Sequence, residues 1–197
     1  MTPHTINFRE LIIGVADVNA YFCSLLHGML RGFGAHKVIE IRDGRELLQA
    51  LSDQKLDALL CDARLPPYGG LKLTHAIRHN QRNENRTIPI LLLSGDARAG
   101  LIKTARDFGA NMVLTKPTSP ASLYDRLAWI AFNPRKFVNA TTYFGPDRRF
   151  KIEGFPGGIG RRKADKAASD VGAPEGPPLS QGDIDNLFTN AKGGDLE

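Results

Sequence analysis

The stretch Asp57–Ile77, DALLCDARLPPYGGLKLTHAI, contains the pattern that decides the fold of this chain. Its first residues, Asp57–Cys61, form a nearly continuous apolar run, which is typical of a strand covered by helices on both sheet faces. Apolar side chains then recur at helical spacing from Leu71 to Ile77. A buried strand, a loop rich in proline and glycine, and a helix therefore follow one another within this stretch.

The same strand–helix unit recurs along the first 133 residues. Apolar runs that predict strands occupy residues 10–16, 37–41, 57–61, 88–93 and 111–115. A segment with helical periodicity follows each run; Gly109 suits the end of the fourth helix, and Ser119 with Pro120 suits the start of the fifth. Five such units predict an α/β fold: a doubly wound, five-stranded parallel sheet with five helices, of the flavodoxin-like kind.

Length and composition exclude several classes of protein. The chain has 197 residues, of which 42% are hydrophobic, so it can bury a core and is not disordered throughout. No apolar run is long enough to span a membrane, and the N-terminus lacks the pattern of a signal peptide. Cys23 and Cys61 stand in apolar runs, which indicates reduced core residues. We therefore expect a cytoplasmic protein.

The charge distribution divides the chain into three parts. The net charge is +4 in residues 1–133, +6 in residues 134–166 and −5 in residues 167–197. We expect the first part to be the folded domain, the second an arginine-rich ligand-binding segment, and the third an acidic flexible tail. Glycine and proline are frequent after residue 133, so we expect residues 134–178 to be largely disordered without a ligand.

Polar residues of four particular types stand where the predicted strands end. They are Asp17, Asp62, Ser94 and Lys116, after or at the ends of the first, third, fourth and fifth runs. Two carboxylates with a backbone carbonyl can hold Mg²⁺, and Asp62 can act as a nucleophile toward a phosphoryl group. Lys116 and Ser94 can bind phosphoryl oxygens. Scattered polar residues at strand ends are the alternative, but four matching types favour a common site.

Residues 8–132 resemble a receiver domain of response regulators, of the CheY type. The resemblance rests on LIIGVAD, LLCDARLPPYGG, ILLLSGDA and VLTKP. It implies a five-stranded parallel sheet with five helices and phosphorylation of Asp62. It further implies Mg²⁺ bound by Asp17, Asp62 and the carbonyl group of Arg64, with Ser94 as the switch residue and Lys116 as the phosphate partner.

Two residues depart from the pattern of this family. Receivers usually carry two adjacent acids after the first strand, and here the pair is Ala16 and Asp17. Because one carboxylate is missing, we expect weaker Mg²⁺ binding and weaker phosphorylation. The position of the usual aromatic switch residue on the fifth strand is Val113. Both departures favour an input other than phosphorylation alone.

The segment Thr141–Asp165, TTYFGPDRRFKIEGFPGGIGRRKAD, combines arginines with aromatic residues, aspartates and glycines. Arginine binds phosphates and the Hoogsteen edge of guanine, aspartate can accept hydrogen bonds from guanine, and aromatic rings stack on bases. This combination fits a guanine nucleotide with phosphates better than DNA, which the aspartates would repel. A basic solvated linker is the alternative.

The segment also resembles the arginine-rich tail of the Cle group of CheY-like proteins, which bind cyclic di-GMP and act on the flagellar motor. The resemblance rests on YFGPDRRF and on RRKAD. It implies contacts to guanines and phosphates from Asp147, Arg148, Arg149, Arg162 and Asp165, and stacking by Tyr143, Phe144 and Phe150, with Arg135 and Arg161 as further candidates.

The end of the chain contains a short amphipathic motif, Leu179–Phe188, LSQGDIDNLF. It resembles the N-terminal peptide of the flagellar switch protein FliM, to which CheY-type receivers bind. The resemblance implies self-docking on the receiver or attachment to a partner at the motor, and hence recruitment to the flagellar pole. A stray amphipathic end is the alternative.

Three functions remain open from the sequence. The first is a cyclic di-GMP effector that acts on FliM at the motor and whose tail becomes ordered with its ligand. The second is a response regulator that receives phosphate on Asp62 from a histidine kinase. The third, DNA binding by the basic tail, ranks last because no helix-turn-helix domain follows the receiver. We expect no enzymatic activity, because the sequence contains no catalytic motif apart from the strand-end cluster. His75 and His79 have a spacing that can bind a metal, but histidines at this spacing more often lie on a solvated helix face.

Overall fold

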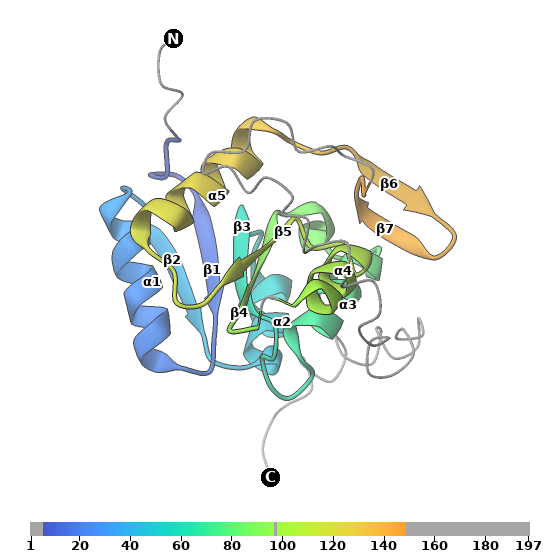
Figure 1. The fold of residues 1–197 in the computed structure, drawn as a ribbon, viewed down its shortest axis with the longest axis horizontal. Coiled ribbons are helices and arrows are strands. Elements are labelled where there is room, and N and C mark those ends of the chain that lie inside the picture. The colour runs from blue at the N-terminus through green and yellow to red at the C-terminus, as the bar shows by residue number, and fades with distance from the viewer. Residues whose placement is uncertain (1–5, 97, 149–197) are drawn as a thin grey trace.

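The computed structural model of this chain describes residues 6–96 and 98–148. Five parallel strands form one sheet in the order β2-β1-β3-β4-β5 (Figure 1). The strands are β1 (Ile12–Ala16), β2 (Lys37–Ile41), β3 (Ala58–Asp62), β4 (Ile90–Ser94) and β5 (Met112–Thr115). Each strand begins and ends within two residues of its predicted run. The doubly wound fold predicted from the sequence is thus confirmed.

Five α-helices and one short 3-10 helix connect the strands. They are α1 (Ala20–Gly32), α2 (Gly44–Asp53), α3 (Gly70–His79), η1 (Glu84–Thr87), α4 (Ala99–Asp107) and α5 (Pro120–Phe132). Side chains cap three of the α-helices: Asn19, Asp43 and Ser119 each accept hydrogen bonds from backbone N–H groups of the first turn. Gly109 follows α4 with a φ of 89°, so the predicted helix end is also confirmed.

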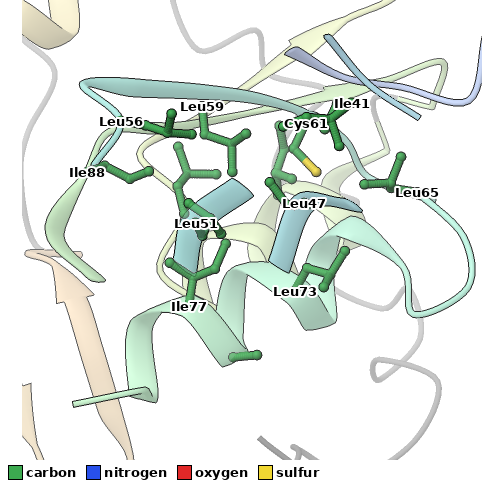
Figure 2. Packing of buried hydrophobic residues seen from close by; sticks show 14 of the residues in the cluster. Ile41, Leu47, Leu51, Leu56, Leu59, Cys61, Leu65, Leu73, Ile77 and Ile88 are labelled. Carbon is green, nitrogen blue, oxygen red and sulfur yellow. The ribbon is translucent and has the colours of Figure 1, made fainter. Parts of the chain in front are cut away.

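The helices cover the sheet in two layers. On one face, α2, α3 and α4 pack around leucines such as Leu47, Leu59 and Leu73, which Figure 2 shows in close contact. On the other face lie α1 and α5 (Figure 1). Residues such as Val15 and Leu60 belong to the core between these helices and the sheet. Because helices cover both faces, the strands are hydrophobic along nearly their whole length. Cys23 and Cys61 are free and buried in these cores.

The structure differs from the sequence-based expectation between residues 134 and 148. A two-stranded antiparallel hairpin forms here, from β6 (Phe137–Ala140) and β7 (Tyr143–Pro146) (Figure 1). The expectation of disorder is therefore wrong for these residues, and the rest of the segment, residues 149–178, lies outside the described part of the chain. A lone hairpin of this length is marginal in water, so the hairpin depends on what it packs against.

The hairpin packs against the domain of the five-stranded sheet through arginine–aromatic contacts. The guanidinium group of Arg86, in η1, lies 3.7 Å from the centroid of the Phe144 ring. Tyr143 is buried, and its hydroxyl group donates a hydrogen bond of 2.6 Å to the carbonyl group of Pro146. A guanidinium over an aromatic ring is favourable, especially where water is excluded. Phe144 of the aromatic segment thus takes part in a tertiary contact with Arg86 that the sequence alone did not reveal.

Arg78 is the buried residue around which this contact is built. It lies near the end of α3 and is fully buried. Its guanidinium donates hydrogen bonds to the carbonyl groups of Gly109 (2.9 Å) and Arg86 (2.8 Å) and to the side-chain oxygen of Asn111 (3.0 Å). Burial lowers the pKa of Arg78 to about 9. Neutral oxygens from three segments thus solvate a buried cation beneath the Phe137 ring, whose centroid is 5.2 Å from Cζ.

Substitution of Gly145 tests whether the hairpin is docked in this way. An added Cβ atom would lie 2.9 Å from Cα of Gly109 and 2.7 Å from the hydroxyl oxygen of Tyr143. We expect Gly145→Ala to weaken the docking by about 1–3 kcal/mol, because backbone atoms cannot move aside cheaply. Amide hydrogen exchange in residues 137–146 should then be faster than in the unaltered protein, while the core strands remain protected.

Gly28→Ala is the matched control for this substitution. No atom lies within 4 Å of the position that its Cβ would take on α1, so this change should stabilise the helix by up to about 1 kcal/mol. Unchanged exchange in the hairpin of Gly145→Ala would show that the contact with Gly109 does not hold the hairpin in place.

Candidate functional site

The carboxyl ends of β1, β3 and β5 bring three charged residues together. Asp17 directly follows β1, Asp62 ends β3, and Lys116 directly follows β5. The register places Ala16 opposite Cys61, Asp62 opposite Leu93 and Ser94 opposite Thr115, so β1, β3 and β5 end at the same edge of the sheet. Residues that are 99 and 54 positions apart in the chain thus become neighbours. The cluster predicted from the strand ends is present.

Lys116 forms ion pairs with both carboxylates. Its ammonium group donates one hydrogen bond to Oδ2 of Asp17 and another to Oδ2 of Asp62. The Asp17 side chain is only 1% exposed, which makes a nearby cation necessary. Burial alone lowers the pKa of Lys116, but the hydrogen bonds to Asp17 and Asp62 outweigh this effect and raise it. The contribution of this lysine to stability is therefore fully present below pH 10.5 and is lost as the pH rises through the raised value.

Backbone N–H groups occupy the remaining carboxylate oxygens. Oδ1 of Asp17 accepts a hydrogen bond of 2.9 Å from the N–H of Asn19, and Oδ1 of Asp62 accepts one of 2.5 Å from the N–H of Arg64. Each carboxylate is thus fixed by one loop N–H and by the shared ammonium group. The ring of Phe22, in α1, lies with its centroid 4.6 Å from Nζ of Lys116. Asn19 and Phe22 were not predicted, because only spatial proximity reveals their role.

The loops beside Asp62 have little space for other side chains. A Cβ atom added to Gly70, the first residue of α3, would lie 2.0 Å from the carbonyl oxygen of Asp62. A glycine is therefore required for α3 to begin this close to β3. Ser94 ends β4 and is buried, and its hydroxyl oxygen accepts a hydrogen bond of 3.0 Å from the N–H of Asp96. This serine stands at the same edge as Asp62, as the sequence predicted.

The residues at this edge fit a weak site for Mg²⁺. The two carboxylates offer hard oxygen ligands, which Mg²⁺ prefers. Ala16 contributes a buried methyl group in place of a third carboxylate. Within the described residues, no group of three histidine, cysteine or acidic side chains is suitably placed for a metal ion. A Mg²⁺ ion would also have to displace the ammonium group of Lys116 from Oδ2 of both aspartates.

The second group of predicted site residues lies at the opposite edge of the sheet, where the strands begin. Arg86, which contacts the hairpin, lies in η1 four residues before β4 begins, and Asn111, which supports this contact, directly precedes β5, whereas Asp62 ends β3. The structure places Arg135, Tyr143, Phe144, Asp147 and Arg148 at this edge. The other predicted residues of this group, Arg149, Phe150, Arg161, Arg162 and Asp165, and the motif Leu179–Phe188, lie outside the described residues.

Arg148 is held at the end of the described chain by two contacts. Its Nη1 atom donates a hydrogen bond of 2.9 Å to Oδ1 of Asp107, at the end of α4. Its guanidinium carbon lies 4.1 Å from the centroid of the Tyr143 ring. Arg135 donates a hydrogen bond to the carbonyl group of Asn111. Two of the predicted arginines thus contact the receiver directly, and the side chain of Arg148 remains 42% exposed.

Comparison with known proteins agrees with the fold. Residues 13–128 match the family model of the response regulator receiver domain. Since this match covers more than half of the chain, the protein belongs to the response regulator receiver family. Receivers are signalling domains that pair with histidine kinases or phosphotransfer proteins. The prediction from the sequence that the chain contains a response regulator receiver domain is therefore confirmed.

Similar sequences include parts of sensor proteins. The chain is 29% identical over 139 residues to the sensory/regulatory protein RpfC of Xanthomonas campestris. These aligned residues make up 71% of this chain and 19% of that protein. It is 31% identical over 96 residues to the CAI-1 autoinducer sensor kinase/phosphatase CqsS of Vibrio cholerae, covering 48% of this chain and 14% of that protein. The chain thus spans less than a fifth of the length of these two curated relatives.

Similar structures include response regulator receivers from two bacteria. A putative response regulator of Chloroflexus aurantiacus is 29% identical, with a TM-score of 0.59 over 64% of this chain and all of that one. The receiver domain of the sensor histidine kinase PA1611 of Pseudomonas aeruginosa is 30% identical, with a TM-score of 0.55 over 62% of this chain and 99% of that one. That receiver was solved with a magnesium ion in its active-site cleft. Among the described residues of the present chain, no helix has the length and apolarity to cross a bilayer.

Substitution of Lys116 tests whether this residue competes with a metal ion for the two carboxylates. Lys116→Met leaves the buried Asp17 carboxylate without its cation, so we expect a loss of about 3 kcal/mol in the free energy of unfolding. Mg²⁺ should then raise the unfolding temperature of Lys116→Met more than that of the unaltered protein. Thermal unfolding with and without Mg²⁺, followed by circular dichroism, measures both effects.

Lys103→Met serves as the control, because Lys103 is an exposed lysine on α4. It should unfold like the unaltered protein and respond to Mg²⁺ to the same extent. If Mg²⁺ stabilises Lys103→Met and Lys116→Met equally, the lysine at the carboxyl edge and the metal ion do not share a site.

Proposed function

We propose that this protein is a phosphoacceptor receiver, in which the carboxylate of Asp62 receives a phosphoryl group from a histidine of a kinase or phosphotransfer protein. The observation that carries the proposal is the position of Asp62. Its carboxylate is 17% exposed at the open edge of the sheet, and one of its oxygens is paired with the ammonium group of Lys116. An acid in this position is open to a phosphoryl donor while its charge remains balanced.

The chemical step is an in-line transfer between two nucleophiles. One oxygen of Asp62 forms a bond to phosphorus as the bond between phosphorus and the histidine nitrogen breaks, and that nitrogen keeps the electron pair. Mg²⁺, when bound by Asp17, Asp62 and the carbonyl group of Arg64, supplies charge neutralisation for the phosphoryl oxygens. Lys116 can turn its ammonium group from the carboxylates to the new phosphoryl oxygens, and the Ser94 hydroxyl group can donate a hydrogen bond to one of them.

The composition of the site favours slow phosphorylation. With Ala16 in place of an acid, the metal has two carboxylates, and Lys116 already neutralises both of them. The sensor proteins to which this chain is similar support a histidine kinase as the source of phosphate. Val113 lies on β5 and packs against the core, so an aromatic rotation at this position plays no part in the response.

Substitution of Asp62 and of Ala16 should have opposite effects on phosphorylation. With a small-molecule phosphodonor and Mg²⁺, we expect Asp62→Asn to incorporate no phosphate, because an amide is not a nucleophile for this reaction. We expect Ala16→Asp to tighten Mg²⁺ binding at least tenfold, which corresponds to about 1.4 kcal/mol, and to speed phosphorylation. Mass spectrometry of the intact protein measures the incorporation, and calorimetry the binding of Mg²⁺.

Asp53→Asn, an exposed acid at the end of α2, is the control and should be phosphorylated normally. Equal phosphorylation of Asp62→Asn and Asp53→Asn would exclude Asp62 as the acceptor. Failure of the unaltered protein and of Ala16→Asp alike to incorporate phosphate would exclude the phosphoacceptor function as a whole.

We also propose a second function, in which the arginine-rich segment binds cyclic di-GMP and the receiver acts on the flagellar switch protein FliM. The observation that favours it is the state of Arg148. Its guanidinium group is partly exposed and is oriented by Asp107 and by the Tyr143 ring. An arginine that is already fixed loses little side-chain entropy when it binds a phosphate or a guanine. The adjacent Arg149 and the later Arg162 would complete such a site.

Removal of two adjacent arginines tests the nucleotide-binding function. We expect the double variant Arg148→Ala with Arg149→Ala to lose cyclic di-GMP binding, since two charge-assisted contacts disappear together, while the receiver stays folded. Calorimetric titration with cyclic di-GMP measures the loss, with GTP and a short DNA as competing ligands. Arg82→Ala, an exposed arginine after α3, should bind as the unaltered protein does. Equal binding by the double variant and Arg82→Ala would exclude this site.

A further inference from the structure

Two histidines on α3 lie against each other in a way that neither proposed function uses. The rings of His75 and His79 are stacked with their centroids 4.0 Å apart and their planes inclined by 20°. Phe108, at the end of α4, contacts His75 edge-on with the centroids 5.2 Å apart. His75 is buried, so the expectation of a solvated helix face is wrong for this residue. The pair stands toward the same end of α3 as Arg78, away from Asp62.

The imidazole of His75 has an unsatisfied nitrogen. Its Nδ1 atom is buried and has no hydrogen-bond partner within the described part of the chain. A buried polar atom without a hydrogen-bond partner costs free energy of folding, so each such atom calls for an explanation. Binding of an ion is one such explanation. Burial, together with the neighbouring His79, lowers the pKa of His75 to about 4. The ring is therefore neutral at physiological pH, and one of its nitrogens always offers a lone pair.

The hydrogen bond of His79 prepares its ring to bind a metal ion. Its Nδ1 atom lies 2.9 Å from the carbonyl oxygen of His75, and a carbonyl can only accept a hydrogen bond. In the neutral ring, Nδ1 therefore carries the proton and Nε2 carries the lone pair. A metal-binding histidine typically donates its other ring N–H to a carbonyl or carboxylate in this way, which fixes the ring and raises its basicity.

From this arrangement we propose that His75 and His79 form a two-histidine site for a divalent transition-metal ion of the zinc or copper type. Imidazole nitrogen suits these ions and not Mg²⁺, so the site is chemically distinct from the carboxylate edge. Two metal–nitrogen bonds of about 2.0–2.1 Å can span nitrogens up to about 4.2 Å apart. The centroids of the two rings are 4.0 Å apart, so the rings are close enough for one nitrogen of each to reach a common ion once the rings turn toward it. Water molecules complete the coordination.

Binding requires both histidine rings to turn from the stacked arrangement. A metal ion lies in the plane of each ring that holds it, so the stacked rings must rotate about their Cβ–Cγ bonds. This torsion is broad in histidine, and its rotation costs little. The ion then links residues one helical turn apart and holds the last turns of α3, from which Arg78 contacts Gly109 and Arg86.

Titration of the full chain with zinc chloride tests this proposal. An excess of Mg²⁺ in every solution competes with zinc for the carboxylates of Asp17 and Asp62, and the variant His79→Ala shows whether the zinc that binds is held by the histidines. We expect one equivalent of zinc to bind and the unfolding temperature to rise with zinc concentration. His79→Ala should weaken binding at least tenfold and abolish the rise, and it leaves the buried His75 in place, so the fold is retained.

Two other histidines supply matched controls. His36 is exposed, and His27 is paired with Glu40 at 2.8 Å and could hold zinc with that carboxylate. His36→Ala and His27→Ala should both bind zinc as the unaltered protein does. Unchanged binding by His79→Ala, or its loss in either control, would overturn the proposal. Absence of zinc binding by the unaltered protein would do so as well.

Discussion

The ammonium group of Lys116, placed between two carboxylates, is the interaction on which the carboxyl edge of this protein depends. Asp17 is almost fully buried, so its charge requires a cation at short distance. The cation comes from a strand end 99 residues away, and the same ammonium group also neutralises Asp62. The parallel sheet must therefore bring β1, β3 and β5 to one edge for any of these charges to be tolerated. The stability of this edge and the phosphoryl transfer that we propose thus depend on the same three side chains.

A second buried cation organises the opposite edge. Arg78 has no carboxylate among its hydrogen-bond partners in the described residues, and three oxygens from Gly109, Arg86 and Asn111 solvate it. The hairpin covers this arrangement with the rings of Phe137 and Phe144, which makes residues 137–146 part of the folded receiver. Since α3 begins beside Asp62 and α4 ends at the Asp107–Arg148 ion pair, both edges are joined through these two helices.

This arrangement bears on the two proposed functions in different ways. The phosphoacceptor function rests on side chains that the structure brings together and on membership of the receiver family. Ala16 leaves a metal ion with only two carboxylates, and Lys116 is already paired with both, so we expect slow phosphorylation. The nucleotide-binding function rests on Arg148 and on arginines beyond the described residues. The docked hairpin gives that segment a fixed starting point at Asp107 and Tyr143.

The sequence by itself determined the class of fold, the order of the strands along the chain and the four residues of the carboxyl edge. These follow from local patterns: apolar runs, helical periodicity, and polar residues at strand ends. It did not determine the hairpin, the role of Phe22 or the burial of His75, and it led to an expectation of disorder where β6 and β7 form. Only the tertiary structure decided these features, because each depends on a contact between segments far apart in the chain. An arginine in a sequence usually indicates a solvent-exposed position. Here Arg78 is buried, and Arg86 is stacked against the ring of Phe144.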